Sequence, residues 1–180
     1  MLFKPYGYLS QFVCEHKKKK LLGEFHNFPE GTMSIGRLDE DSEGLLLLTT
    51  DGKMSEAYRS KTVEKEYYAQ VDGLITDDAV NQLKTGVEIG GIEGGKYVTL
   101  PCNAKRLEDS PQLPARARKI RDDRHGPTSW VSITVTEGKF RQVRKMTAAV
   151  GFPTLRLVRV RIGEILLGDL QPGEVREIQL

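Results

Sequence analysis

Cysteine and histidine are scarce in this sequence of 180 residues. The two cysteines, Cys14 and Cys102, lie far apart with no C-x-x-C spacing, and the three histidines show no metal-ligand spacing. These absences argue against a disulfide framework and a Cys/His zinc site. We expect unpaired thiols, no bound metal and no cofactor.

Long apolar runs are also missing. The longest aliphatic run is Leu45 to Leu48, far shorter than a membrane span, and the N-terminus lacks the charged-then-apolar order of a signal peptide. A chain of this length with 38% hydrophobic residues can still bury a proper core. We expect one cytoplasmic domain over residues 1–180, in two lobes, monomeric and with no membrane partner.

The net charge is only +2, but the charges are unevenly distributed. Residues 1–90 hold 11 Lys and Arg against 15 Asp and Glu, whereas residues 91–180 hold 16 against 10. From Lys139 to Arg161 there are seven basic residues and no acid. A charge run is usually a solvated face, but a protein that binds a polyanion needs such a patch. Composition alone leaves both interpretations open.

Periodicity indicates the fold class. Alternating apolar and polar residues predict strands at 66–71, 130–136 and 154–162, with a bulge between Leu157 and Val158. Helices are predicted after an N-cap at Thr76 and from Arg141 to a stop at Gly151. Residues 103–129, rich in proline and basic residues, are expected to form a long loop or hairpin. Without a βαβ rhythm, the pattern is typical of an α+β fold with a mainly antiparallel sheet.

A cluster of carboxylates precedes the leucine run. The stretch "IGRLDEDSEGLLLLTTDG" contains Asp39, Glu40, Asp41 and Glu43. Read as a calcium loop from Asp39, it places Thr50 where a bidentate Glu is required, and the preceding segment cannot be a helix. Alternatively, Asp39 and Ser42 satisfy backbone donors at a turn. By residue type alone, that turn and a catalytic role remain equally open.

Two motifs resemble the signatures of the RsuA-type pseudouridine synthases. "GRLDEDSEGLLLLTTDG" is similar to the first signature and "EGKFRQVRKM" to the second, and "KPYGYLSQF" and "KEYYAQV" agree in order and spacing. The resemblance implies an α+β catalytic fold with two lobes around a bent sheet and a central cleft. Most members carry an S4 RNA-binding domain before the K-P motif. That motif begins here at Lys4, so we expect no S4 domain, as in the family's E-type branch, which acts on large-subunit rRNA.

The resemblance also implies the chemistry. The family converts a chosen uridine of ribosomal RNA to pseudouridine without metal or cofactor, and Asp39 takes the position of its catalytic carboxylate. Arg144 is expected to hold Asp39 with its guanidinium, and Tyr67 to stack on the uracil. The neighbouring acids Glu40, Asp41 and Glu43 are expected to be solvated.

RNA contacts are implied as well, with large-subunit rRNA as the expected partner. Arg37 is similar to the arginine that flips the target base, and Phe140 departs from the polar residue common in the family. We assign phosphate contacts to further basic residues, namely Lys4, Lys139, Arg141, Lys145, and Arg118 in the 103–129 loop. The alternative is a ribosome-assembly factor that binds rRNA without modifying it.

Overall fold

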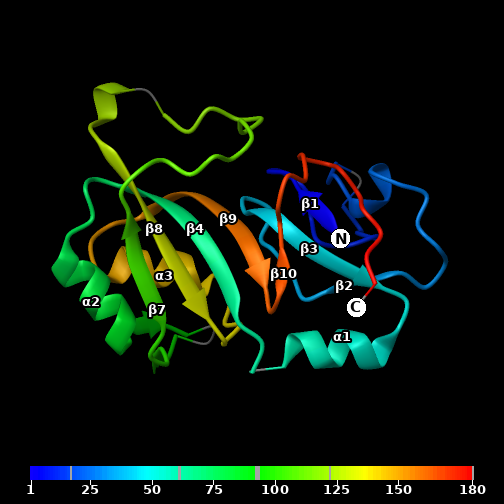
Figure 1. Cartoon of the computed structure of the whole chain (residues 1–180), viewed down its shortest axis with the longest axis horizontal. Coiled ribbons are helices and arrows are strands. Elements are labelled where there is room, and N and C mark those ends of the chain that lie inside the picture. The colour runs from blue at the N-terminus through cyan, green and yellow to red at the C-terminus, as the bar shows by residue number, and fades with distance from the viewer. Residues whose placement is uncertain (17, 61, 92–93, 122, 180) are drawn as a thin grey trace.

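The computed structural model describes residues 1–16, 18–60, 62–91, 94–121 and 123–179 (Figure 1). Its strands are β1 (Leu2–Lys4), β2 (Met33–Ile35), β3 (Glu43–Thr49), β4 (Lys65–Asp72), β5 (Glu88–Gly90), β6 (Lys96–Val98), β7 (Asn103–Leu107), β8 (Thr128–Val135), β9 (Thr154–Ile162) and β10 (Ile165–Leu166). Its helices are α1 (Gly52–Arg59), α2 (Asp77–Thr85) and α3 (Gln142–Ala149), with 3₁₀ turns at Leu22–Glu24 and Asp123–His125.

One sheet of eight strands runs through the molecule. Its order is β1-β3-β9-β4-β8-β7, with β2 paired to β3 and β10 to β9, while β5 and β6 form a separate pair. Strand β3 pairs with β9 in parallel, and the other strand pairs are antiparallel. The predicted α+β class with a mainly antiparallel sheet is confirmed.

The two lobes of the sheet have separate cores. In one, α2 and α3 pack on β4, β7 and β8, around side chains such as Leu83, Ile133 and Met146. In the other, β1, β3 and the end of β9 bury Phe3 and Leu45. The leucine run therefore forms the buried β3. Among the residues described, no helix is long and apolar enough to cross a bilayer.

The predicted helices are found close to their expected bounds. Thr76 caps α2 by accepting a hydrogen bond from the Ala79 amide at 3.2 Å, and α3 begins one residue after Arg141. Helix α1 was not predicted. Its N-cap Asp51 accepts hydrogen bonds from two backbone amides, so the TTDG end of the first motif starts a helix.

The predicted bulge in β9 is wrong in position. The register against β4 shifts between Glu66 and Tyr67 and between Gln70 and Val71, not at Leu157 and Val158. Leu157 belongs to the core under α2 and α3, whereas Val158 belongs to the other core. Because each face of β9 meets a hydrophobic core, two consecutive apolar residues simply point to opposite faces.

Candidate active site

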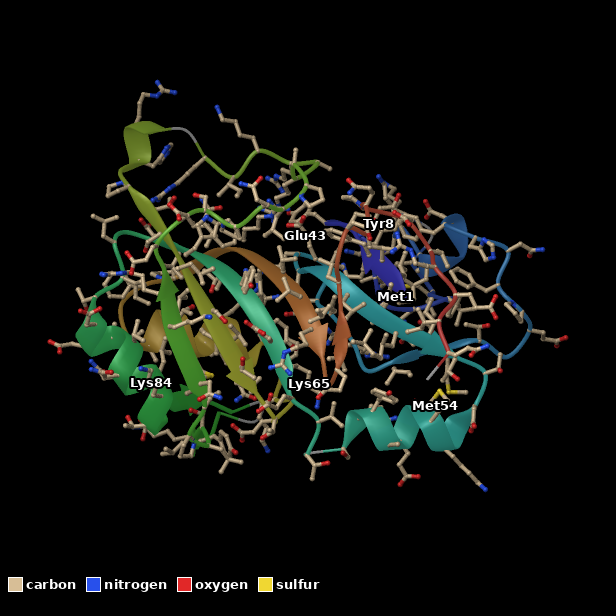
Figure 2. All side chains as sticks on the ribbon, viewed as in Figure 1. Met1, Tyr8, Glu43, Met54, Lys65 and Lys84 are labelled. Carbon is tan, nitrogen blue, oxygen red and sulfur yellow. The ribbon has the colours of Figure 1, made fainter. Side chains whose placement is uncertain are left out.

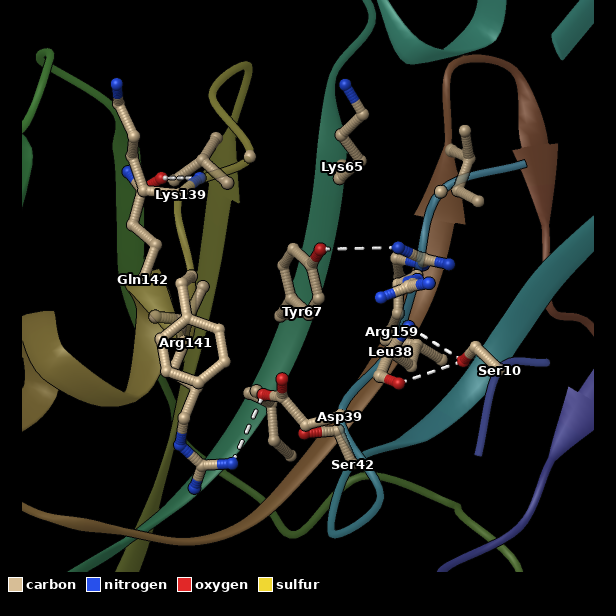
Figure 3. Close-up of a pocket in the computed structure, with 18 of the residues that line it drawn as sticks. Ser10, Leu38, Asp39, Ser42, Lys65, Tyr67, Lys139, Arg141, Gln142 and Arg159 are labelled. Atoms are coloured by element: carbon tan, nitrogen blue, oxygen red, sulfur yellow. Dashed lines mark hydrogen bonds and ion pairs between the residues drawn. The ribbon is translucent and has the colours of Figure 1, made fainter. Parts of the chain in front are cut away.

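A pocket of about 730 Å³ lies against β4 and β9, and both lobes contribute to its lining. Residues 35–40, at the end of β2 and in the turn before β3, form one wall (Figure 3). Residues 135–143, from the end of β8 into α3, form the opposite wall. Asp39 and Tyr67 both line the space between these walls. The structure therefore brings these two predicted site residues together.

The turn that carries Asp39, residues 39–42 and called the acidic turn below, is fixed by the N-terminal segment. The Ser10 hydroxyl accepts a hydrogen bond from the Leu38 amide and donates one to the Leu38 carbonyl, each at 2.9 Å. The Gly7 amide donates to the Glu40 carbonyl at 2.8 Å. These contacts hold the backbone on both sides of Asp39, and they explain why the KPYGYLSQF motif accompanies the acidic one.

Gly44 allows β3 to approach β9 closely. Its φ is +105°, and a Cβ there would lie 2.3 Å from the Arg159 carbonyl oxygen. Any side chain would both clash with backbone and strain the turn. The glycine thus connects the acidic turn to the buried leucines, with β9 directly alongside.

The cation nearest Asp39 is Arg141, not the predicted Arg144. An Nη1 of Arg141 lies 3.5 Å from Asp39 Oδ2, and the same guanidinium binds both carboxylate oxygens of Asp41 at 2.9 and 2.8 Å. Arg141 adopts φ +52°, the only positive φ of a non-glycine residue described. This left-handed residue ends the turn before α3 and directs its side chain across the pocket.

Arg144 holds the acidic turn rather than Asp39 itself. Its Nη2 donates to the Asp41 carbonyl at 2.7 Å and to Ser42 Oγ at 3.1 Å. In the described part of the chain, no contact between Arg144 and Asp39 within ion-pair distance is found, and Arg144 does not line the pocket. The expected Arg144–Asp39 fork is therefore wrong, and Arg144 instead binds the backbone and Ser42 of the turn.

Two neighbouring acids, Asp41 and Glu43, are held by arginines, contrary to the prediction that they are solvated, whereas Glu40 pairs with Lys19 at the surface. Burial alone would raise the pKa of Asp41, but the hydrogen bond from Arg141 and the charge of Arg144 together lower it. Glu43 is 2% exposed and binds Arg156. These contacts leave no open carboxylate cluster, and no metal-binding group of His, Cys, Asp or Glu is found in the described parts of the chain.

Two basic residues that sequence analysis did not assign to the site stand next to Tyr67. Arg159, paired with Tyr67 across β4 and β9, donates from Nη1 to the tyrosine hydroxyl at 3.5 Å and from Nε to the Leu45 carbonyl at 2.8 Å (Figure 3). Lys65 lines the same pocket, and burial, followed by the charge of Arg159, lowers its pKa. A basic residue inside an apolar strand was the available signal for Arg159.

The predicted RNA-contact residues are divided between different places. Arg37 and Lys139 are exposed at the pocket. Lys145 lies outside the pocket lining and donates to the Gly90 carbonyl at 2.7 Å. Arg118 also lies outside it. Lys4 is 0% exposed, with Nζ bound to backbone carbonyls, so the predicted RNA contact of Lys4 is wrong.

The buried Lys4 predicts a pH effect on stability. Burial, opposed by the charge of Glu43 and other acids, lowers the pKa of Lys4 from 10.5 to about 8. Between these values the unfolded chain binds more protons, so the free energy of unfolding should rise with pH, by about 3 kcal/mol from this group. Urea unfolding across this range, with Lys4→Met as the reference, measures it. Equal pH slopes for both proteins would contradict the prediction.

Substitution of Arg144 should mainly reduce stability, whereas substitution of Arg141 should mainly reduce turnover. Arg144→Ala should lower the free energy of unfolding by about 2–3 kcal/mol, because it leaves the Asp41 carbonyl and Ser42 without their donor. Arg141→Ala should cost under about 1 kcal/mol, since its ion pairs are one-third exposed, yet lower kcat more than tenfold by releasing Asp39. Urea unfolding and turnover, measured together, test this; equal stability losses would refute it.

The comparisons with known proteins agree with one another. The family described as RNA pseudouridylate synthase matches residues 1–149. A relative named ribosomal large subunit pseudouridine synthase E, from Vibrio parahaemolyticus, is 44% identical over 181 residues, covering 98% of this chain and 72% of its own length. Its namesake from Xanthomonas campestris is 44% identical over 179 residues, covering 98% and 92%.

A solved structure has the same fold. The crystal structure of a pseudouridylate synthase superposes with a TM-score of 0.78 at 28% identity and covers 99% of this chain and 68% of that one. A Cbf5-Nop10-Gar1 complex superposes with a TM-score of 0.57 at 17% identity, over 90% of this chain and 47% of that one, which shows the fold alone.

Proposed function

Because the chain belongs to the RNA pseudouridylate synthase family, we propose that it converts a uridine of large-subunit ribosomal RNA to pseudouridine, with Asp39 as the catalytic carboxylate. The observation that carries the proposal is the Asp39 carboxylate facing Tyr67 in one pocket, with Arg141 beside it. Relatives named ribosomal large subunit pseudouridine synthase E support the choice of RNA.

The reaction is an isomerisation. The N1–C1′ bond of the uridine breaks, the uracil turns, a C5–C1′ bond forms, and the proton of C5 is replaced by one on N1. Neither oxidation nor net hydrolysis occurs. Asp39 either attacks C1′ as nucleophile or removes a proton from C2′ to give a glycal, and both routes require its ionised carboxylate next to the ribose.

Each side chain around Asp39 has a role in this proposal. Arg141 holds the Asp39 carboxylate in the pocket through its 3.5 Å ion pair. Tyr67 stacks on the uracil and relays the proton that leaves C5, while Arg159 fixes its hydroxyl. Arg144 acts through the backbone of the acidic turn.

The target base must leave its helix to reach Asp39. Arg37 is exposed at the pocket, and no hydrogen bond or ion pair of its side chain is found among the described residues. It fills the place of the extruded base, and Lys139 holds a flanking phosphate. Phe140, 56% exposed on the same wall, offers an aromatic face to a neighbouring base.

We propose a monomer that acts in the cytoplasm, where its rRNA substrate is found. The decisive experiment maps pseudouridines in large-subunit rRNA from cells with and without the gene. Purified protein should then restore the missing pseudouridine in rRNA from the deletion strain. An unchanged map, with no restoration, would reject the function.

A further inference from the structure

A second pocket, of about 380 Å³, lies on the opposite face of the sheet from Asp39. Gln70 lines this pocket and Tyr67 lines the first, and residues three apart on β4 point to opposite faces. Most of its remaining lining comes from the segment between β7 and β8, which runs along the upper end of the sheet in Figure 1, together with Thr128 and Arg156. None of the described residues of this basic segment lines the active-site pocket.

Basic side chains dominate this second pocket, which we call the rear groove. Its described lining contains five cations and no acid: Arg116, Arg118, Lys119, Arg121 and Arg156. From outside the lining, Glu43 pairs with Arg116 and Arg156, and Asp72 pairs with Arg121. Arg118 and Lys119 are exposed, and within the described chain neither has an ion pair. The unneutralised charge of the groove is thus at its accessible rim.

The rear groove is anchored to the acidic turn. The Arg116 guanidinium lies 4.0 Å from the centroid of the Tyr6 ring and contacts Glu43 at 3.3 Å. Arg118 donates to the Tyr6 hydroxyl at 3.1 Å, and the Pro114 carbonyl accepts from Arg156 at 2.8 Å. Figure 2 shows Glu43 where this segment meets the sheet. These contacts hold the cations in place before any ligand binds, which lowers the ordering cost of binding.

We propose that the rear groove binds the phosphate backbone of a second rRNA segment, separate from the strand that enters the active-site pocket. The inference rests on the proposed function, because a large folded rRNA can present phosphates to both faces at once. Lys and Arg at an open rim release counterions from a polyanion when they bind it. The rear groove lining offers little aromatic surface for stacking a base, so backbone contact is the mode that fits.

The test compares two substrates with one variant. Arg118→Gln/Lys119→Gln removes both rim charges, and Lys53→Gln/Lys84→Gln removes two exposed charges from α1 and α2 as the matched control. Each protein is assayed on deproteinised large-subunit rRNA and on a short stem-loop with the uridine that the parent modifies. For Arg118→Gln/Lys119→Gln, KM on the rRNA should rise about tenfold. The slope of log binding constant against log salt concentration should become less steep by about two units. On the stem-loop, KM should change less than about twofold.

The outcomes separate the rear groove from the proposed activity. Equal KM changes on both substrates would mean that the rim holds the target strand, which overturns the proposal. No change on either would mean that the groove serves another partner, such as an acidic protein surface, and overturns it too. If the parent modifies no uridine, the proposed function fails, while the salt slope with the same rRNA still decides whether the groove binds RNA.

Discussion

Asp39→Asn is expected to bind rRNA as tightly as the parent and to form no detectable pseudouridine. The substitution keeps the size of the side chain and removes its charge. Without the carboxylate, the neighbouring acids are engaged elsewhere, since both carboxylate oxygens of Asp41 are bound by Arg141 and Glu40 pairs with Lys19. We expect kcat to fall about 10⁴-fold or more, measured as tritium released from uridine labelled at C5 in an rRNA fragment.

Loss of turnover with binding retained distinguishes the enzyme from an assembly factor that only holds rRNA. The Asp39 carboxylate repels phosphate, so its loss should not weaken the complex. Glu40→Gln is the matched control, because it removes a charge from the same turn that pairs with the exposed Lys19. It should keep most of the activity. Parent-level tritium release by Asp39→Asn would instead show that another residue is the catalytic acid.

Much of the central fold could be predicted because its signals are local. Alternation of apolar and polar residues predicted β4, β8 and β9, and the N-cap at Thr76 predicted α2, because both signals depend on neighbouring residues. The short strands β1, β2 and β10 were not predicted. Two or three residues carry no periodicity, and these strands form only because β3 and β9 offer them edges.

Motif resemblance predicted Asp39 and Tyr67 in one pocket but assigned the Asp39 contact to Arg144, where the structure has Arg141. Arg141 and Arg144 are three residues apart at the start of α3, so both face the acidic turn. Which of them reaches Asp39 depends on the left-handed backbone of Arg141, and residue type does not reveal that conformation. The sequence could place the cation near Asp39 only to within one helical turn.

Burial of charged residues was the least predictable feature. Lys4 and Glu43 are charged residue types that are almost never fully buried without a partner, and solvation or surface contact was the reasonable expectation. Lys4 donates to the carbonyl of Tyr8, four residues away in an irregular turn, which carries no periodic signal. Glu43 binds Arg156, 113 residues away. The same long-range packing placed the basic 108–127 segment on the rear face instead of at the pocket.

Glu43→Gln is expected to be among the most destabilising polar substitutions in the chain. The Glu43 carboxylate accepts hydrogen bonds from Arg156 Nε and Nη2, both at 3.0 Å, and contacts Arg116 at 3.3 Å. All three side chains are less than 10% exposed. Removing one negative charge leaves two guanidinium groups uncompensated in a buried site, which typically costs about 3–5 kcal/mol.

Urea unfolding of the variant measures this loss, and activity reports its consequence. Glu43 begins β3 directly after the acidic turn, so Glu43→Gln should also misplace Asp39 and lower kcat, more than its exposed counterpart Glu56→Gln on α1 does. Glu43→Asp keeps the charge and should recover part of the stability. A loss below about 1 kcal/mol would mean that water reaches the pair and screens it, as at surface ion pairs. The Arg116 contact would then no longer fix the rear groove to the acidic turn.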